Sequence, residues 1–197
     1  MTYPIFVNLK GVHITIVGGG RIACRKIENI LDQGALIKVV APNIINQIKT
    51  LAESDENITL IEEKFQTDHL NDSSLVFLTS DDEIINKEVN DFCVQKGILV
   101  NNCMDSSKST FRNGAVIRRG ELEIAIASGG KRPGISKWIK DMILDRLPEQ
   151  LDEVIIMYDQ VREQAKEKFN NSKDREVFVR NALKEYLETL EGQSHED

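Results

Sequence analysis

Apolar runs alternate with segments of helical periodicity along the first hundred residues of the chain. Short, almost continuously apolar runs predict strands over residues 13–17, 36–42, 58–63, 74–80 and 98–105. Residues 21–31 and 81–97 instead space their apolar positions as a helix does, and a glycine ends each segment. This alternation with short connections predicts an α/β fold, a Rossmann-type parallel sheet covered by helices.

The pattern changes after residue 105. Residues 115–128 predict a hairpin that turns at Arg119-Gly120, and the chain from about residue 135 is helical with a break at Pro148. We therefore expect three parts: a Rossmann domain over residues 1–112, a small strand–helix segment over 113–147, and a helical C-terminal domain over 148–197.

Three consecutive glycines separate the first predicted strand from the first predicted helix. Within HITIVGGGRIACRK the spacing is Gly18-x-Gly20-x-x-Ala23, the dinucleotide-binding pattern in its required strand–helix context. The first glycine permits a tight turn, and the second lets a pyrophosphate approach the backbone at the helix N-terminus. We therefore expect a dinucleotide here; the alternative is a tight turn that holds no ligand.

The usual carboxylate that binds the adenosine ribose is missing. It would follow the second strand, where this chain reads Val40-Ala41-Pro42-Asn43. Asn43 can hydrogen-bond a ribose hydroxyl, and no Lys or Arg stands directly at the strand end to require a 2′-phosphate. NAD is therefore favoured over NADP.

Composition narrows the class of protein. Hydrophobic residues make up 41% of the chain and charged residues 29%, and no apolar run approaches the ~20 residues that span a bilayer. The protein is therefore not expected to bind a membrane. The three cysteines have no C-x-x-C spacing, so a reducing, cytoplasmic setting is expected. The histidines (His13, His69 and His195) form no metal-binding pattern.

Charge is unevenly spread along the chain. The formal net charge of −7 argues against general nucleic-acid binding. Residues 106–140 nevertheless hold eight basic residues and two acidic ones, a net charge of +6, whereas the chain from Glu149 onward carries −6. The basic segment indicates a local anionic ligand, or else a solvated face or a contact with the acidic part of the same or a partner chain.

Several motifs in order resemble one family. The stretches PIFVNLKG, VGGGRIACRK, VVAP, TSDDEIIN, VNNCMD and SGGKRPG are similar to successive signatures of the precorrin-2 dehydrogenases, the stand-alone relatives of the N-terminal module of siroheme synthase. The resemblance implies oxidation of precorrin-2 to sirohydrochlorin with NAD, in siroheme or cobalamin synthesis. Some members also insert ferrous iron, and the sequence leaves that activity open.

The resemblance also assigns cofactor residues. It implies that the phosphate-side turn contains Gly18, Gly20, Arg21 and Ile22. It implies that Pro42 and Asn43 lie on the adenosine side, and that Thr79 and Ser80 lie beside the nicotinamide.

The resemblance places Asp105 in the active-site cleft as a general base or as an acceptor that orients a pyrrole N–H. From the residues alone, the alternative for Asp105 is to cap the SSKS turn, and the alternative for Ser128 is to open the Gly129-Gly130 turn. Ser128 is expected to bind substrate, together with four cations of the basic segment: Arg118, Arg119, Lys131 and Arg132.

Two positions depart from the family pattern. Asn113-Gly114-Ala115 has glycine where relatives usually have proline, and Arg132-Pro133 replaces a common Ser-Pro. The arginine adds a cation near the expected tetrapyrrole.

Two other functions remain as alternatives. One is a non-catalytic NAD-sensing module like the regulatory domains of potassium transport systems, and the other is a different small-molecule dehydrogenase. The hairpin and the helix after it are too small to bury their apolar face alone, so we also expect a homodimer joined through residues of about 113–147.

Overall fold

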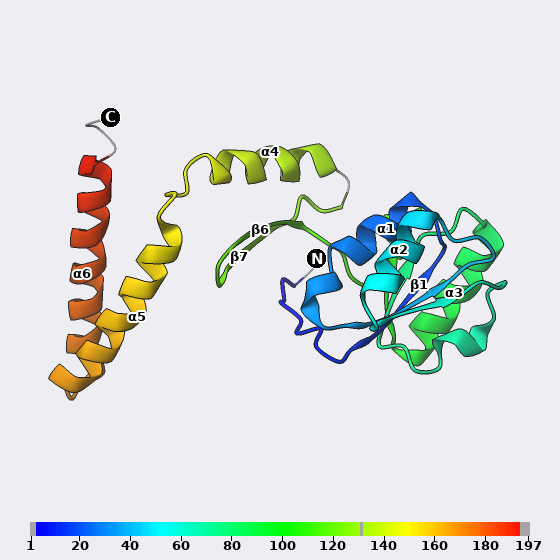
Figure 1. Cartoon of the computed structure of the whole chain (residues 1–197), viewed down its shortest axis with the longest axis horizontal. Helices are drawn as coiled ribbons and strands as arrows, with labels where there is room; N and C mark the ends of the chain where they lie inside the picture. Colours follow the sequence, from blue (N-terminus) through cyan, green and yellow to red (C-terminus); the bar gives the residue numbers. More distant parts are fainter. Residues whose placement is uncertain (1–2, 131, 194–197) are drawn as a thin grey trace. The chain divides into compact units, whose positions relative to one another are not determined.

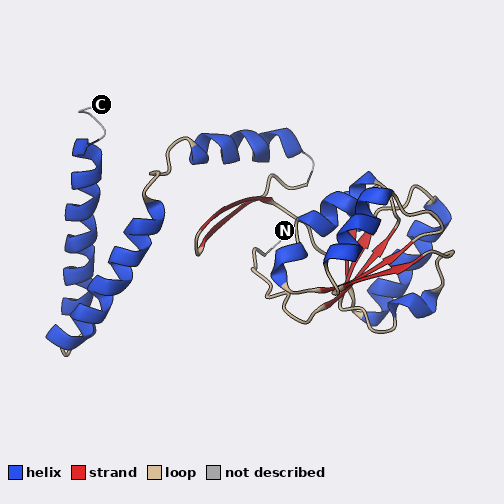
Figure 2. Cartoon of the chain, in the orientation of Figure 1, coloured by secondary structure: helices blue, strands red, loops and turns tan. Residues whose placement is uncertain are grey.

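The computed structural model describes residues 3–130 and 132–193. The chain divides into two compact units, Met1–Asn113 and Gly114–Asp197. Figures 1 and 2 show that strands with helices packed around them form the first unit, whereas a strand pair and three helices form the second.

A five-stranded parallel sheet forms the centre of the first unit. Its strands are β1 (His13–Val17), β2 (Leu36–Val40), β3 (Ile58–Ile61), β4 (Leu75–Leu78) and β5 (Leu99–Asn102). Their order is β3-β2-β1-β4-β5, so the chain reverses its direction across the sheet between β1 and β4. Ligands of such sheets bind at this switch point, beyond the carboxyl ends of the strands. The Rossmann-type prediction is confirmed.

Helices cover both faces of the sheet. They are α1 (Arg21–Glu28), α2 (Asn46–Ser54) and α3 (Glu83–Lys96), with short 3₁₀ turns η1 (Leu31–Gln33), η2 (Thr67–Leu70) and η3 (Ser106–Lys108). Two separate cores result. Ile16 and Phe77 pack on the face that Ile27 of α1 covers, while Val76 and Val89 belong to the core beneath α3. Alternate residues of one strand therefore face opposite cores, which explains the continuous apolar runs.

The end of β5 and the presence of α2 differ from the sequence prediction. β5 was expected to reach residue 105 but ends at Asn102, because the Asn102 Oδ1 accepts the backbone N–H groups of Met104 and Asp105 at 3.0 and 2.8 Å. That side chain turns the backbone out of the sheet. In addition, α2 lies in a stretch for which no element had been predicted.

The second unit begins with the predicted hairpin. β6 (Ala115–Arg119) pairs antiparallel with β7 (Leu122–Ile126), and Gly120 makes the turn with a positive φ of 52°. A Cβ at Gly114 would come within 2.8 Å of the Ile126 carbonyl oxygen, so the close approach of the two backbone segments at this end of the hairpin requires a glycine.

Three helices complete the second unit: α4 (Pro133–Leu144), α5 (Leu151–Lys168) and α6 (Ser172–Gln193). Proline at the first position of α4 suits a helix start, because its missing N–H would have no partner there. The C-terminal region is helical as expected, with a break at residues 145–150 around Pro148 and a second break at residues 169–171 between α5 and α6.

Lys26 holds the end of the first unit in place. Its Nζ donates to the Oδ1 atoms of Asn101 and Asn113 at 3.1 and 3.2 Å, and it lies 4.9 Å from the ring centre of Phe77. Asn101 in turn donates to the Phe111 carbonyl at 3.0 Å. Burial lowers the pKa of Lys26 below its ordinary value. A single cation thus ties α1 to β5 and to Asn113, where the first unit ends.

Candidate cofactor and substrate site

The turn between β1 and α1 is packed against the end of β4. Gly18 has a φ of +118°, and a Cβ there would lie 2.5 Å from the Thr79 Oγ1 and 2.9 Å from the Ser80 nitrogen. No other residue type fits this backbone conformation and this spacing. The turn after β1 is therefore packed tightly against the end of β4 at Gly18.

The loop after β2 packs against the next glycine. A Cβ on Gly19 would collide with the carbonyl oxygen of Asn43 and approach the Ile44 Cα to 2.9 Å. The Ile45 N–H donates to the Gly19 carbonyl at 3.0 Å. The structure thus brings the predicted adenosine-side residues Pro42 and Asn43 next to the glycine turn.

Gly20 differs from Gly18 and Gly19, because a Cβ on Gly20 would meet no atom within 4 Å. It is the N-cap residue of α1 and provides no side-chain cap, and no acidic residue occupies the first turn of the helix. The N-terminal amides of α1, which starts with Arg21 and Ile22, therefore face open space without an anionic partner from a capping side chain. An open cradle at a helix N-terminus fits a dinucleotide pyrophosphate.

The hydroxyls of Thr79 and Ser80 form hydrogen bonds with backbone groups. Thr79 Oγ1 donates to the Val17 carbonyl at 2.9 Å, and Ser80 Oγ accepts the Asp82 N–H at 3.1 Å. Asn86 of α3 donates its Nδ2 to the Ser80 carbonyl at 2.9 Å. Sequence reasoning missed Asn86; its signal was a polar residue on the buried stripe of α3, where Val89 and Cys93 also lie.

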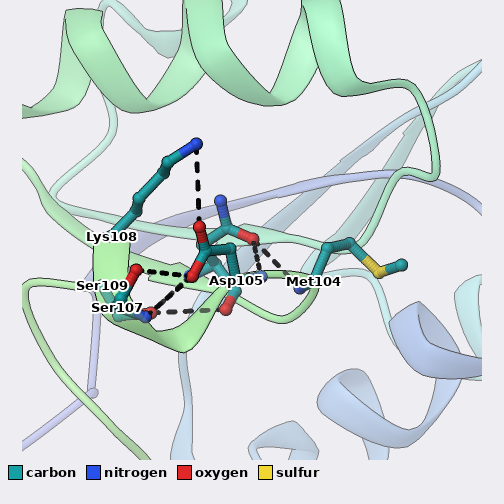
Figure 3. Close-up of polar contacts among 6 residues, drawn as sticks. Met104, Asp105, Ser107, Lys108 and Ser109 are labelled. Carbon is teal, nitrogen blue, oxygen red and sulfur yellow. Dashed lines mark hydrogen bonds and ion pairs between the residues drawn. The ribbon is translucent and has the colours of Figure 1, made fainter.

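Asp105 stands beyond the carboxyl end of β5 and begins the η3 turn (Figure 3). Its Oδ1 accepts hydrogen bonds from the Ser107 N–H at 3.0 Å and the Ser107 hydroxyl at 2.6 Å. Its Oδ2 lies 3.6 Å from the Lys108 Nζ. Asp105 therefore does cap the SSKS turn, but the cap occupies only one of its two oxygens.

These contacts hold the Asp105 carboxylate in its charged form. The hydrogen bond from the Ser107 hydroxyl, supported by the Ser107 backbone N–H and the Lys108 charge, lowers the pKa of Asp105 below its usual range. A carboxylate with a lowered pKa is a weak proton acceptor but a good partner for an N–H donor or a positive charge. The geometry therefore favours orientation of a substrate N–H over general-base catalysis.

Two of the five predicted substrate residues of the second unit, Ser128 and Arg118, are engaged with protein groups. Ser128 Oγ donates to the Arg132 carbonyl at 2.7 Å and accepts the Ser136 hydroxyl at 2.7 Å, which ties the glycine loop to α4. Arg118 forms an ion pair with Glu123 across the hairpin at 2.8 Å. The side chains of Arg119 and Arg132 are exposed, and Lys131 lies outside the described residues.

No cluster of three or more His, Cys, Asp or Glu side chains that could hold a metal ion occurs among the described residues. In the same part of the chain, no helix combines the length and apolarity needed to cross a bilayer.

Comparison with known proteins identifies relatives over almost the whole chain. The chain is 32% identical over 180 residues to siroheme synthase of Photorhabdus laumondii, and 31% identical over 175 residues to that of Pseudoalteromonas translucida. These matches cover 91% and 89% of this chain but only 38% and 37% of the relatives. The chain thus spans less than two-fifths of the length of these siroheme synthases.

A solved structure of SirC, a precorrin-2 dehydrogenase, matches with a TM-score of 0.77 and 25% identity, over 97% of this chain and all of the other. The resemblance inferred from the motifs is thereby confirmed. A family profile described as "Putative NAD(P)-binding" matches residues 5–115, which include the glycine turn and the whole parallel sheet. The chain belongs to this NAD(P)-binding family, shares its fold with SirC, and is similar in sequence to part of the siroheme synthases.

Proposed function

We propose that this chain oxidises precorrin-2 to sirohydrochlorin with NAD as the cofactor. The observation that carries the proposal is the match to SirC, which extends over both units and over the full length of that precorrin-2 dehydrogenase. An NAD-sensing module would need only the first unit, so it leaves the hairpin and helices of the second unit unexplained. The proposal does not extend to iron insertion.

The first unit would hold the cofactor. The pyrophosphate would lie in the cradle at Gly20 and the N-terminal amides of α1, with Asn43 on the ribose side and Thr79-Ser80 on the nicotinamide side. Bound there, NAD supplies the hydride acceptor. Because the Thr79 and Ser80 hydroxyls are engaged with backbone groups, their part is to shape the pocket wall rather than to exchange protons.

Asp105 would orient the substrate. Precorrin-2 carries pyrrole N–H groups, and the Asp105 Oδ2 is the carboxylate oxygen that the turn leaves available. The exposed cations Arg119 and Arg132 would meet its acetate and propionate groups, with Lys131 as a further candidate. Ser128 would act mainly by holding the Gly129-Gly130 loop against α4.

We further propose a homodimer, with the chain at work in the cytoplasm. α4 exposes Ile135, Trp138 and Met142, which are 46%, 62% and 46% exposed and lie on one side of the helix by their spacing. An apolar stripe of this kind beside a two-stranded sheet is typical of a surface that another chain covers.

Anaerobic turnover tests the enzymatic proposal. Wild-type protein should convert precorrin-2 to sirohydrochlorin with NAD, followed by absorbance. Asp105→Asn should lower kcat roughly 10²-fold without changing the NAD dissociation constant, because the amide keeps the shape but loses the charge. Measurable NAD binding without turnover would favour the sensing module. Full activity of Asp105→Asn would remove Asp105 from the proposed site.

Gly20→Ala separates cofactor binding from folding. Its Cβ meets no protein atom, so the melting temperature should stay close to that of the wild type. The same Cβ enters the space of the pyrophosphate, so the NAD dissociation constant should rise about tenfold or more. Gly134→Ala, also placed in open space but in α4, is the matched control and should bind NAD normally. Unchanged NAD affinity in Gly20→Ala would place the pyrophosphate elsewhere.

Ser107→Ala should shift the pH profile of kcat/KM. Removal of the hydroxyl takes away the largest cause of the lowered pKa of Asp105, so that pKa should rise. Activity needs the charged carboxylate, and the acid limb of the profile should therefore move to higher pH. Ser106→Ala, in the same turn, is the control. A profile that does not move, or one that moves equally in both variants, would contradict this role of Ser107.

The dimer proposal predicts that Trp138→Glu yields a monomer in sedimentation velocity at micromolar concentration, since a charge in the apolar stripe opposes its burial. Lys137→Glu changes the neighbouring exposed residue off the stripe and should leave the dimer intact. A monomeric wild-type protein would refute the proposal.

A further inference from the structure

A hollow of about 640 Å³ lies between α5 and α6 in the second unit. Figure 1 shows these two helices meeting at their connection and diverging away from it. One face of each helix lines the hollow, with Tyr158, Arg162, Ala165 and Lys166 from α5, and Ser172, Arg175, Glu176, Val179, Arg180 and Leu183 from α6. Its volume is that of a small-molecule site, for which 300–1,000 Å³ is typical.

The residues that line the hollow carry a net positive charge, whereas the C-terminal region around them carries a net negative charge. The chain from Glu149 onward has seven basic and thirteen acidic residues. Four of the seven basic residues (Arg162, Lys166, Arg175 and Arg180) line the hollow, whereas Glu176 is the one acidic lining residue in the described part of the chain. The hollow therefore carries a net charge of +3 in a region of −6.

Packing at the helix connection fixes the closed end of the hollow. The rings of Phe169 and Phe178 are 5.5 Å apart, and Arg175 donates its Nε to the Phe169 carbonyl at 2.8 Å. Ala165 and Val179, 1% and 8% exposed, form the apolar floor. The hollow is thus shaped by packed side chains and by the small size of Ala165.

The cations of the hollow are only partly neutralised by the protein. Lys166 has Glu163 at 2.6 Å, and the Arg162 charge also acts on Glu163. The side chains of Arg162 and Arg180 make no hydrogen bond or ion pair with any residue that the structure describes. Arg162 and Lys166 stand one helical turn apart, an arrangement in which like charges destabilise a helix. An anion between the two helices would remove this repulsion.

We propose that the hollow binds a small polyanion that bears two or more carboxylate or phosphate groups. Arg162 of α5 and Arg180 of α6 contact the anion from the two helices. The side chain of Arg175 is held in position by its hydrogen bond to the Phe169 carbonyl, and Tyr158 offers a hydroxyl. All lining residues of the hollow belong to the second unit, whereas the glycine turn belongs to the first. Binding in the hollow does not depend on the proposed dehydrogenase activity.

Titration calorimetry of the full chain with citrate and with inorganic pyrophosphate, at low ionic strength, tests the proposal. At least one anion should bind saturably with one site per chain in the hollow, and the stronger of the two identifies the carboxylate or the phosphate class. Arg162→Gln/Arg180→Gln should weaken that binding about tenfold or more, and each single variant should weaken it by a smaller factor. Lys173→Gln/Lys184→Gln, which removes the same charge from α6 outside the hollow, should stay within about twofold of wild type.

Three outcomes would overturn the proposal. One is the absence of saturable binding of either anion below about 10 mM. Another is an equal loss of affinity in both double variants, which would indicate general attraction to positive charge. The third is unchanged binding in Arg162→Gln/Arg180→Gln, which would place the anion at the glycine turn or on the hairpin. Circular dichroism of each variant, whose altered side chains are all exposed, establishes that it is folded.

Discussion

The first unit depends on the absence of a side chain at Gly18. The chain leaves the sheet after β1 at the point where the strand order reverses, and the end of β4 lies beside this turn. A Cβ on Gly18 would therefore lie 2.5 Å from the Thr79 Oγ1. Gly19 meets the loop after β2 in the same way. The two close contacts bring three chain segments together and leave open space only at Gly20. The cradle for a pyrophosphate is therefore a consequence of packing on either side of it.

Side chains around this cradle have structural tasks as well as candidate chemical ones. The Thr79 hydroxyl bonds the Val17 carbonyl, and the Asp105 Oδ1 caps η3. Such engagement fixes positions, and the hydrogen bond from the Ser107 hydroxyl also lowers the pKa of Asp105. In the site that we propose, backbone amides would bind the phosphate groups and the Asp105 carboxylate would orient the substrate.

Local sequence signals predicted most of the first unit, because buried parallel strands and the glycine turn leave strong patterns. Expectations failed where a tertiary contact or a single side chain decides the outcome. Asn102 ends β5 by accepting two backbone N–H groups, which an apolar run cannot reveal. Asn86 holds the Thr79-Ser80 turn through its hydrogen bond to the Ser80 carbonyl, a partner six residues away that periodicity does not specify. The assigned roles of Asp105 and Ser128 remain predictions, since each residue also has the capping or turn contact that the sequence allowed.

Charge was the least predictable property, because a sum over a segment does not say which groups meet. The basic segment carries +6, yet Arg118 is paired with Glu123 across the hairpin and Lys108 lies beside Asp105. The acidic C-terminal region carries −6, yet helical periodicity gathers Arg162 and Arg180 on the two faces that line one hollow. Electrostatic interactions act over about 8–10 Å in physiological salt, so the local arrangement governs ligand binding more than the total. A region of negative net charge can therefore contain a locally positive surface.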